Sequence, residues 1–403
     1  MKKEISLAIN GGKPVRDTYL PYGRQWIDET DIEAVVNVLK GDFLTTGPVI
    51  SKFEQSIADY VGSKYAVAFS NGTAALHAAC FAAGISEGDE VITTPMTFAA
   101  SANCILYQGG KPVFADINPY TYNIDPVSIE RAITEKTKCI IPVDFTGQPA
   151  DLDTICQIAH KYNLTIIEDA AHALGAEYKG RKIGSISDMT MFSFHPVKHI
   201  TTGEGGVITT NNTAFYEKLI QFRSHGITRN PKHFIHHHGP WYYEMHCLGF
   251  NYRMTDIQAA LGISQLRKLD GFIKMRKHLA ALYDEAFRNM KEVVLPFQNQ
   301  DCNSSWHLYI IRLNLDLLQA GRKEIFEALQ KENIGVNVHY IPAYYHPFYQ
   351  MLDYQKGLCP NAEKLYEEII TLPLFPLMTE ADIQDVIEAV KKVITHYSAE
   401  GKA

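Results

Sequence analysis

Short apolar runs alternate along the chain with longer segments in which apolar residues recur at helical spacing. The strand-like runs fall at 66–69, 90–93, 111–117, 139–145, 164–169, 189–194 and 205–210. The helical segments fall at 31–41, from the 70–73 turn to about 84, at 97–110, near 126–135, at 151–162 and up to about 222. Because strands that alternate with helices form parallel sheets covered on both faces, the pattern predicts an α/β fold with a mostly parallel central sheet.

The pattern changes beyond residue 222. Residues 223–253 are irregular and rich in His and aromatic side chains, and 254–290 form one long helical stretch. A strand is expected at 307–313, a helix at 322–332, a strand at 336–340 and a closing helix from about 380. We therefore predict a large domain over 1–265, with an N-terminal arm over about 1–30, and a linking helix with a smaller C-terminal α/β domain over 266–403.

The composition is that of a globular enzyme. Apolar residues make up 46% of the chain, and the excess of Asp and Glu (45) over Lys and Arg (38) gives a net charge of −7. This charge argues against a nucleic acid partner. No apolar core follows the two N-terminal Lys residues, and no run approaches the ~18 apolar residues of a membrane span. We predict a cytoplasmic protein without a signal peptide or membrane contact.

Neither the cysteines nor the histidines predict a metal site. The seven Cys residues are scattered and contain no Cys-x-x-Cys pair, which is typical of reduced thiols. His236, His237 and His238 are consecutive, and consecutive residues do not converge on one ion in a regular element. We favour a solvated or substrate-facing loop here over a metal site.

Several polar segments follow the ends of predicted strands. They are the 70–73 turn, Thr97 with Phe98, the 144–148 turn, Asp169, and the 193–198 segment. In α/β sheets, ligands bind beyond the carboxyl ends of the strands. We therefore expect these segments to meet at one edge of the sheet and to form the binding site.

Lys198 and Asp169 suggest the chemistry of this site. A Lys amine in a partly desolvated site has a lowered pKa and can form an aldimine with pyridoxal 5'-phosphate, and a carboxylate can hold the protonated ring nitrogen of that cofactor. Lys198 precedes a Gly-Glu-Gly-Gly hinge, and Asp169 ends an apolar run. The alternatives are a surface lysine and a helix N-cap for Asp169. We predict a pyridoxal phosphate enzyme that carries its cofactor on Lys198.

Other residues are candidates for cofactor contacts. Gly72 and Thr73 open a helix whose free N–H groups and dipole favour a phosphate, and Ser193 adds a hydroxyl. His172 is a candidate for one face of the ring, or for a satisfied core histidine. Phe98 is a candidate for the opposite face, or for the core. Gln148, in the 147–151 turn, is a candidate for the ring oxygen.

Five segments together resemble one enzyme family. They are LTTGPVISKFE (44–54), SNGTAALHAA (70–79), EDAAHALGA (168–176), SFHPVKHITTGEGG (193–206) and GFNYRMTDIQAALGISQL (249–266). The chain is identified by them as similar to the DegT/DnrJ/EryC1/StrS sugar aminotransferases over about residues 20–395. The resemblance implies a fold-type-I pyridoxal-phosphate-dependent transferase and a homodimer with shared active sites. In such a dimer Asn251 would reach the phosphate of the partner's cofactor. Some members are dehydratases with His at the cofactor Lys position, so Lys198 favours amino transfer.

The resemblance also implies a substrate. The wording of 193–206, FRSHGITR (222–229) and VNVHYIPAYYHPFY (336–349) is closest to the pseudaminic acid branch of the family. Members of that branch move the amino group of L-glutamate to C4 of a UDP-linked 4-keto-6-deoxy-N-acetylhexosamine. The product is UDP-4-amino-4,6-dideoxy-N-acetyl-β-L-altrosamine. Candidate substrate contacts are Thr45, Arg229, His339 and Tyr340, for which capping, packing or solvent exposure are the alternatives.

Two other functions stay open at this point. One is amino transfer to a different nucleotide-linked keto sugar, such as a dTDP-4-keto-6-deoxyhexose. The other is a regulatory protein that binds the cofactor without turning it over. The combination of Lys198, Asp169 and Ser193 argues against the second.

Overall fold

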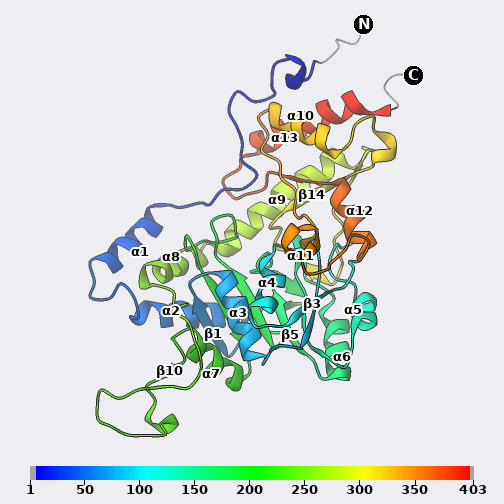
Figure 1. The fold of residues 1–403 in the computed structure, drawn as a ribbon. Coiled ribbons are helices and arrows are strands. Elements are labelled where there is room, and N and C mark those ends of the chain that lie inside the picture. The colour runs from blue at the N-terminus through cyan, green and yellow to red at the C-terminus, as the bar shows by residue number, and fades with distance from the viewer. Residues whose placement is uncertain (1–5, 400–403) are drawn as a thin grey trace.

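The computed structural model describes residues 6–399 and contains a seven-stranded sheet in the order β1-β9-β8-β5-β4-β2-β3 (Figure 1). β9 runs antiparallel to both of its neighbours, and the other strands share one direction. The predicted mostly parallel sheet is confirmed. Its strands are β1 (Tyr65–Phe69), β2 (Glu90–Thr93), β3 (Lys111–Phe114), β4 (Thr137–Ile141), β5 (Thr165–Asp169), β8 (Met189–Ser193) and β9 (Gly206–Thr210).

Alternate side chains of the strands build two separate cores, one on each face of the sheet. In β5, Ile166 belongs to one core and Ile167 to the other. Two sets of helices cover these faces, as predicted. One set is α3 (Gly72–Ala82), α4 (Ala100–Tyr107) and α7 (Thr213–Phe222), and the other is α2 (Pro48–Val61), α5 (Pro126–Ala132) and α6 (Leu152–Tyr162).

The reversal of β9 places the loop that carries Lys198. Ser193, at the end of β8, pairs with Gly206, at the start of β9, so the loop between them leaves and returns at one edge of the sheet. A parallel neighbour would need a crossover to the other end of the sheet, usually through a helix. The antiparallel step therefore keeps Lys198 at the carboxyl end of β8.

The predicted long helix over 254–290 is two helices. α8 (Asp256–Leu266) begins with a capping box in which Thr255 and Gln258 satisfy each other's backbone N–H groups, and it packs against α1 (Glu29–Leu39) and α2. α9 (Leu269–Phe287) follows after Lys268 and leads toward the C-terminal unit (Figure 1).

The C-terminal unit is a small antiparallel sheet with helices, as the sequence predicts in outline. Its strands and helices are β12 (Val293–Val294), β14 (Tyr309–Leu313), β15 (Ile369–Leu372), α10 (Arg322–Lys331), α11 (Pro347–Gln350), α12 (Pro360–Glu368) and α13 (Glu380–Tyr397). The strand expected at 336–340 is wrong. Only Asn337 pairs there, in an isolated bridge with Thr371, while the unpredicted β15 occupies the sheet beside β14.

The remaining elements are short. They are η1 (Ala8–Asn10), η2 (Phe145–Gly147), β6 (Glu177–Tyr178), β7 (Arg181–Lys182), β10 (Ile227–Thr228), η3 (Pro231–His233), β11 (Glu244–Met245), β13 (Cys302–Asn303), η4 (Leu315–Leu317) and η5 (Ala343–Tyr345). No helix within residues 6–399 is long and apolar enough to cross a membrane.

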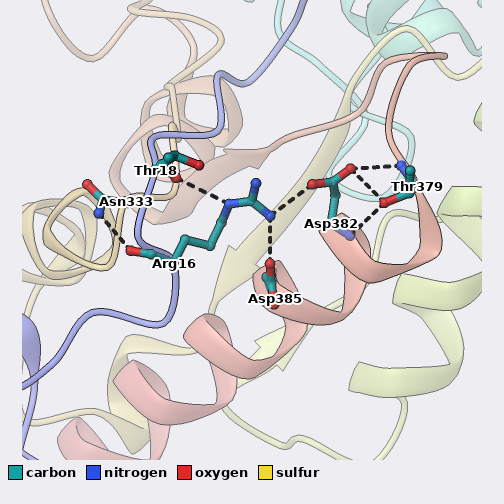
Figure 2. Close-up of polar contacts among 6 residues, drawn as sticks. All are labelled: Arg16, Thr18, Asn333, Thr379, Asp382 and Asp385. Carbon is teal, nitrogen blue, oxygen red and sulfur yellow. Dashed lines mark hydrogen bonds and ion pairs between the residues drawn. The ribbon is translucent and has the colours of Figure 1, made fainter.

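The N-terminal arm packs on the C-terminal unit, although it lies next to the large domain in sequence. Leu7 and Leu20 belong to the core that α9, α10 and α13 share. Arg16 donates to Asp382 at 2.8 Å and to Asp385 at 2.6 Å, both on α13 (Figure 2). Glu332 is fully buried beside the arm. We therefore propose that residues 6–20 belong with the smaller domain and not with the large domain, to which the sequence analysis assigned them.

Glu332→Ala will destabilise this arm strongly. The Glu332 carboxylate accepts hydrogen bonds from the N–H groups of Ala8 and Val15, both at 2.9 Å, and from Lys392 Nζ at 2.8 Å. Its loss leaves a nearly buried ammonium without its counter-charge. We expect the free energy of unfolding to fall by about 3–5 kcal/mol in urea titrations.

Arg16→Met is the matched control. Its ion pairs are partly exposed, so its loss should cost only about 1 kcal/mol. Equal small effects of the two substitutions would show that burial does not make Glu332 the main anchor of the arm.

Candidate active site

A cavity of about 1030 Å³ lies at the carboxyl ends of the strands. Residues 337–341 of the C-terminal unit form part of its wall. The structure brings most of the sequence-predicted residues together here. Those that line the cavity are Gly72, Thr73, Phe98, Asp169, His172, Ser193, Lys198, His339 and Tyr340.

Four predicted residues lie outside this lining. Gln148 is buried and its amide holds a loop, because it accepts from the N–H of Asn299 at 2.6 Å and donates to the carbonyl of Phe297 at 3.1 Å. The geometry thus gives Gln148 a structural role instead of the predicted contact with the ring oxygen. Thr45, Arg229 and Asn251 are exposed on the surface of this chain.

Lys198 reaches the cavity from the loop between β8 and β9. Desolvation lowers the pKa of its amine to about 8, and the nearby positive charge of Arg276 acts in the same direction. The carboxylate of Asp169 opposes both effects. Roughly a tenth of the amine is therefore free of its extra proton at pH 7, far more than for an exposed lysine, and this is the form that attacks a carbonyl carbon.

Asp169 ends β5 with its side chain on the face covered by α4. Ser101 on α4 donates to Asp169 Oδ2 at 2.6 Å, and Ser101 also shares a hydrogen bond of 2.7 Å with Thr97. The N–H of Ala171 donates to Oδ1 at 3.1 Å, within a turn that starts no helix, so the capping alternative is not realised. Burial raises the pKa of Asp169, while Ser101, Ala171 and Lys198 counteract the rise.

The start of α3 forms a backbone cradle beside Ser193. Asn71 caps the helix by accepting from the N–H of Ala74 at 2.8 Å, so the first N–H groups of the helix, at Gly72 and Thr73, have no intrahelical acceptor. A Cβ on Gly72 would lie 3.3 Å from Met191 Sδ and 3.4 Å from Ser193 Oγ. Only a glycine therefore fits comfortably, and it leaves space where an anion can approach the backbone.

Imidazole and phenol rings form another part of the wall. His172 Nε2 lies 3.0 Å from the Tyr340 hydroxyl, and its ring centroid lies 4.3 Å from that of His307. His172 Nδ1 is buried and has no partner among the described side chains. Phe98 is 63% exposed, and its ring centroid lies 6.3 Å from that of Tyr340.

Three cavity-related residues were missed by the sequence analysis. Ser101 holds Asp169, and His307 lies 3.5 Å from Lys198 Nζ. Arg276 is buried and donates to the carbonyls of Trp306, His307 and Leu374. The sequence could have indicated Ser101, because it lies one helical turn after Thr97 in the segment that follows β2. His307 and Arg276 belong to the C-terminal half of the chain, and no local sequence pattern shows that this half packs against the edge of the sheet.

The His-rich segment is organised by one carboxylate. Glu244 accepts from the N–H groups of Ile235 and His236 and from the Tyr242 hydroxyl, and it pairs with His246 Nε2 at 2.7 Å. Within residues 6–399, no group of three or more His, Cys, Asp and Glu side chains could hold a metal ion. The segment projects away from the sheet below β10 (Figure 1).

Residues 25–391 match the DegT/DnrJ/EryC1/StrS aminotransferase family. The chain belongs to this family. It is 42% identical to the spore coat polysaccharide biosynthesis protein SpsC of Bacillus subtilis, over 94% of this chain and 98% of that protein. It is 39% identical to the UDP-4-amino-4,6-dideoxy-N-acetyl-beta-L-altrosamine transaminase of Campylobacter jejuni, over 93% of this chain and 99% of that protein.

Solved structures of family members show the same fold. The aminotransferase PseC of Helicobacter pylori, involved in pseudaminic acid biosynthesis, has a TM-score of 0.88 and 33% identity over 94% of this chain and 100% of that one. The pyridoxal phosphate form of the sugar aminotransferase Spr1654 of Streptococcus pneumoniae has a TM-score of 0.87 and 33% identity over 94% of this chain and 99% of that one. The protein is therefore a sugar aminotransferase of the pyridoxal-phosphate-dependent type, and the alternative of a regulatory protein is dropped.

The cavity fits the cofactor that this DegT/DnrJ/EryC1/StrS aminotransferase requires. A Lys amine, a buried carboxylate and a backbone cradle beside a Ser hydroxyl are the donor set that pyridoxal phosphate needs. All three stand at the carboxyl ends of β1, β5 and β8 or in the loops that follow them.

Ser101→Ala will move the pH dependence of pyridoxal phosphate binding. The Ser101 hydroxyl stabilises the charged form of Asp169, so its loss raises the pKa of that carboxyl. Asp169 then becomes protonated at higher pH, and the acid limb of the binding curve moves upward by about one pH unit, equivalent to about 1.4 kcal/mol. Fluorescence titration with the cofactor at a series of pH values measures the shift.

Thr97→Val is the control for this substitution. It removes a hydroxyl that contacts Ser101 but not Asp169, so its acid limb should move much less. An acid limb that stays in place in Ser101→Ala would remove Ser101 from any role in setting the charge of Asp169.

Proposed function

We propose that the enzyme moves the amino group of L-glutamate to C4 of a UDP-linked 4-keto-6-deoxy-N-acetylhexosamine. The product is UDP-4-amino-4,6-dideoxy-N-acetyl-β-L-altrosamine. The observation that carries this proposal is the lowered pKa of Lys198 beside Asp169 in a cavity of about 1030 Å³. Similarity to the transaminase of Campylobacter jejuni and to PseC supports the choice of sugar.

We propose Lys198 as the residue to which pyridoxal phosphate is attached covalently. When bound, the cofactor supplies an electron sink for the carbanion that forms next to the transferred amine. Lys198 Nζ would act as the base and acid of the reaction: it would take the proton from the donor carbon and give one to the sugar carbon. Asp169 holds a proton on the ring nitrogen through its carboxylate, which Ser101 keeps in place.

Other residues would bind the cofactor and orient the cofactor and the substrate. The N–H groups of Gly72 and Thr73 and the Ser193 hydroxyl bind the phosphate. His172 covers one face of the ring, held in its orientation by Tyr340, and Phe98 stays our candidate for the opposite face. His339 accompanies Tyr340 at the cavity wall, where both remain candidate substrate contacts. The Thr45 and Arg229 contacts would require the partner subunit's cavity, because neither lines this one.

We also propose a homodimer in which each subunit completes the other's site. Asn251 is exposed and does not line the cavity of its own chain, although its neighbour Tyr252 does. Large apolar side chains near it in the fold are also exposed, and exposed apolar patches mark interaction sites. They are Phe43 (55%), Leu44 (49%), Leu248 (78%) and Phe250 (37%). Residues 45 and 255 pair through an isolated bridge, which brings the two segments together.

A second candidate is amino transfer to a different nucleotide-linked keto sugar, such as a dTDP-linked 4-keto-6-deoxyhexose. The identity to SpsC, whose name refers to spore coat polysaccharide biosynthesis, supports a sugar other than that of the first candidate. The groups that we assign to the amino transfer itself, Lys198 and Asp169, would serve both reactions. Selectivity between the two nucleotide sugars would therefore depend on other residues of the cavity wall.

Lys198→Ala will abolish amino transfer while leaving the fold intact. It removes the amine that attaches the cofactor and moves the proton, so turnover should fall by at least about 10²–10⁴-fold. The assay couples the enzyme to the dehydratase that makes the UDP-linked 4-keto sugar, supplies glutamate, and locates the new amine by NMR. Borohydride reduction followed by digestion should place the cofactor on the Lys198 peptide in the wild type only.

Lys138→Ala, an exposed lysine on β4, is the control and should behave as the wild type. A reduced adduct on any other lysine would overturn the assignment of Lys198. A panel that includes dTDP-linked keto sugars tests the substrate separately. Preference for a dTDP-linked sugar would select the second candidate without affecting Lys198.

Mixing two inactive variants will restore activity if Asn251 serves the partner's site. In a heterodimer of Lys198→Ala and Asn251→Ala subunits, one site holds both intact residues and the other holds neither. Random exchange between equal amounts gives roughly a quarter of the wild-type number of intact sites. The measurement is turnover after the two variants are exchanged through mild denaturation. Absence of recovery, with heterodimers verified by mass spectrometry, would place Asn251 in its own subunit's site or in none.

A further inference from the structure

A buried imidazole lies against the amine of Lys198. His307 Nε2 is 3.5 Å from Lys198 Nζ, the residue is 4% exposed, and its side chain lines the cavity. The mechanism proposed above gives this side chain no task. A buried polar group this close to the reactive nitrogen changes the relative stability of the two protonation states of that nitrogen.

The backbone holds His307 in this position from two sides. The N–H groups of Ser305 and Leu308 donate to the carbonyls of Gly147 and Thr146, and Arg276 donates to the His307 carbonyl at 3.1 Å. Gly147 has a φ of +103°, and a Cβ there would lie 2.9 Å from the backbone nitrogen of His307. These hydrogen bonds therefore hold the backbone around His307 against the 144–148 turn, at the wall of the cavity.

The surroundings of the ring select one tautomer. His307 Nδ1 is buried and has no partner among the described side chains. A proton on Nδ1 would be a buried N–H without an acceptor, which proteins rarely tolerate and which costs about 1–3 kcal/mol. Desolvation lowers the pKa of His307 well below its usual value, and the charge of Lys198 adds to this, so the ring is neutral. Its one proton therefore lies on Nε2, the atom that faces Lys198.

We propose that His307 is a positioning residue that donates from Nε2 to the lone pair of Lys198 Nζ and holds that side chain as the free amine. An ammonium has three donors and no acceptor, so the same contact opposes the protonated form. The contact thereby favours the deprotonated form of the amine and orients it when it is not attached to the cofactor. This inference rests on the proposed role of Lys198 and adds the group that prepares it.

Several other groups set the charge of Lys198, and the test must separate them from His307. Asp169 on β5 favours the ammonium, whereas Arg276 on α9 opposes it. The imidazoles that also face Lys198 have lowered pKa values and are neutral. They are His172, His199 and His339.

A matched pair of variants tests the contact. The amide of Gln reaches the position of Nε2, whereas the shorter amide of Asn reaches only that of Nδ1. We expect His307→Gln to keep the pKa of Lys198 near the wild-type value and His307→Asn to raise it. The readout is the rate at which trinitrobenzenesulfonate modifies Lys198 in the full-length, cofactor-free protein, followed by peptide mass spectrometry from about pH 6 to about pH 10. At pH values below the pKa, Lys198 in His307→Asn should react about five- to tenfold more slowly.

Two results would overturn the proposal. One is an unchanged or lowered pKa of Lys198 in His307→Asn, and the other is an equal rise in both variants. Circular dichroism checks that each variant folds. If either variant does not fold, ¹⁵N NMR of the full-length wild-type protein tests the tautomer of His307 directly. The proposal requires a proton on Nε2 and none on Nδ1, and the opposite tautomer would refute it. Both readouts are independent of the borohydride experiment, so a failure of His307 is distinguishable from a failure of Lys198 as the attachment residue.

Discussion

The cost of keeping an amine out of water governs this active site. Desolvation is the largest influence on the pKa of Lys198 and lowers it to about 8. The same desolvation raises the pKa of Asp169, so burial pushes both groups toward their neutral forms. What decides their states is the set of contacts around them. Ser101 and the N–H of Ala171 favour a charged Asp169, and Arg276 disfavours a charged Lys198. The site thus combines a carboxyl whose hydrogen bonds favour the charged form with an amine whose pKa is lowered.

This balance depends on the C-terminal unit lying over the sheet edge. Arg276 on α9 donates from Nη1 to the carbonyls of His307 and Leu374 and so holds two segments of the C-terminal unit together. One of these segments carries His307 to the cavity wall. The N-terminal arm is held on this unit through Glu332, which accepts from the N–H groups of Ala8 and Val15. Arg16 adds ion pairs to α13 (Figure 2).

The sequence predicts the parts of this arrangement that follow from local periodicity. Ile166 and Ile167 face opposite cores because strand side chains alternate, and the same rule places Asp169 at the end of a buried strand. The sequence does not predict contacts whose partners are distant along the chain. Gln148 looks like a site residue, but Phe297 and Asn299 engage its amide. Most of the expected strand at 336–340 lines the cavity instead, and only Asn337 pairs with another residue, in an isolated bridge with Thr371. Tertiary packing determined both outcomes.

The alternation of side chains in β5 also separates acidic groups that would otherwise interfere. Glu168 points to the face opposite Asp169, where it meets Asp144 in full burial. Asp144 Oδ2 and Glu168 Oε1 are both buried and have no hydrogen-bond partner within the described residues. Burial and the charge of Glu168 raise the pKa of Asp144 far above its usual value, so Asp144 carries the proton. Two carboxylates this close would otherwise repel each other and raise the pKa of Asp169 as well. Asp169 is thus the carboxyl of β5 that faces the cavity and Lys198.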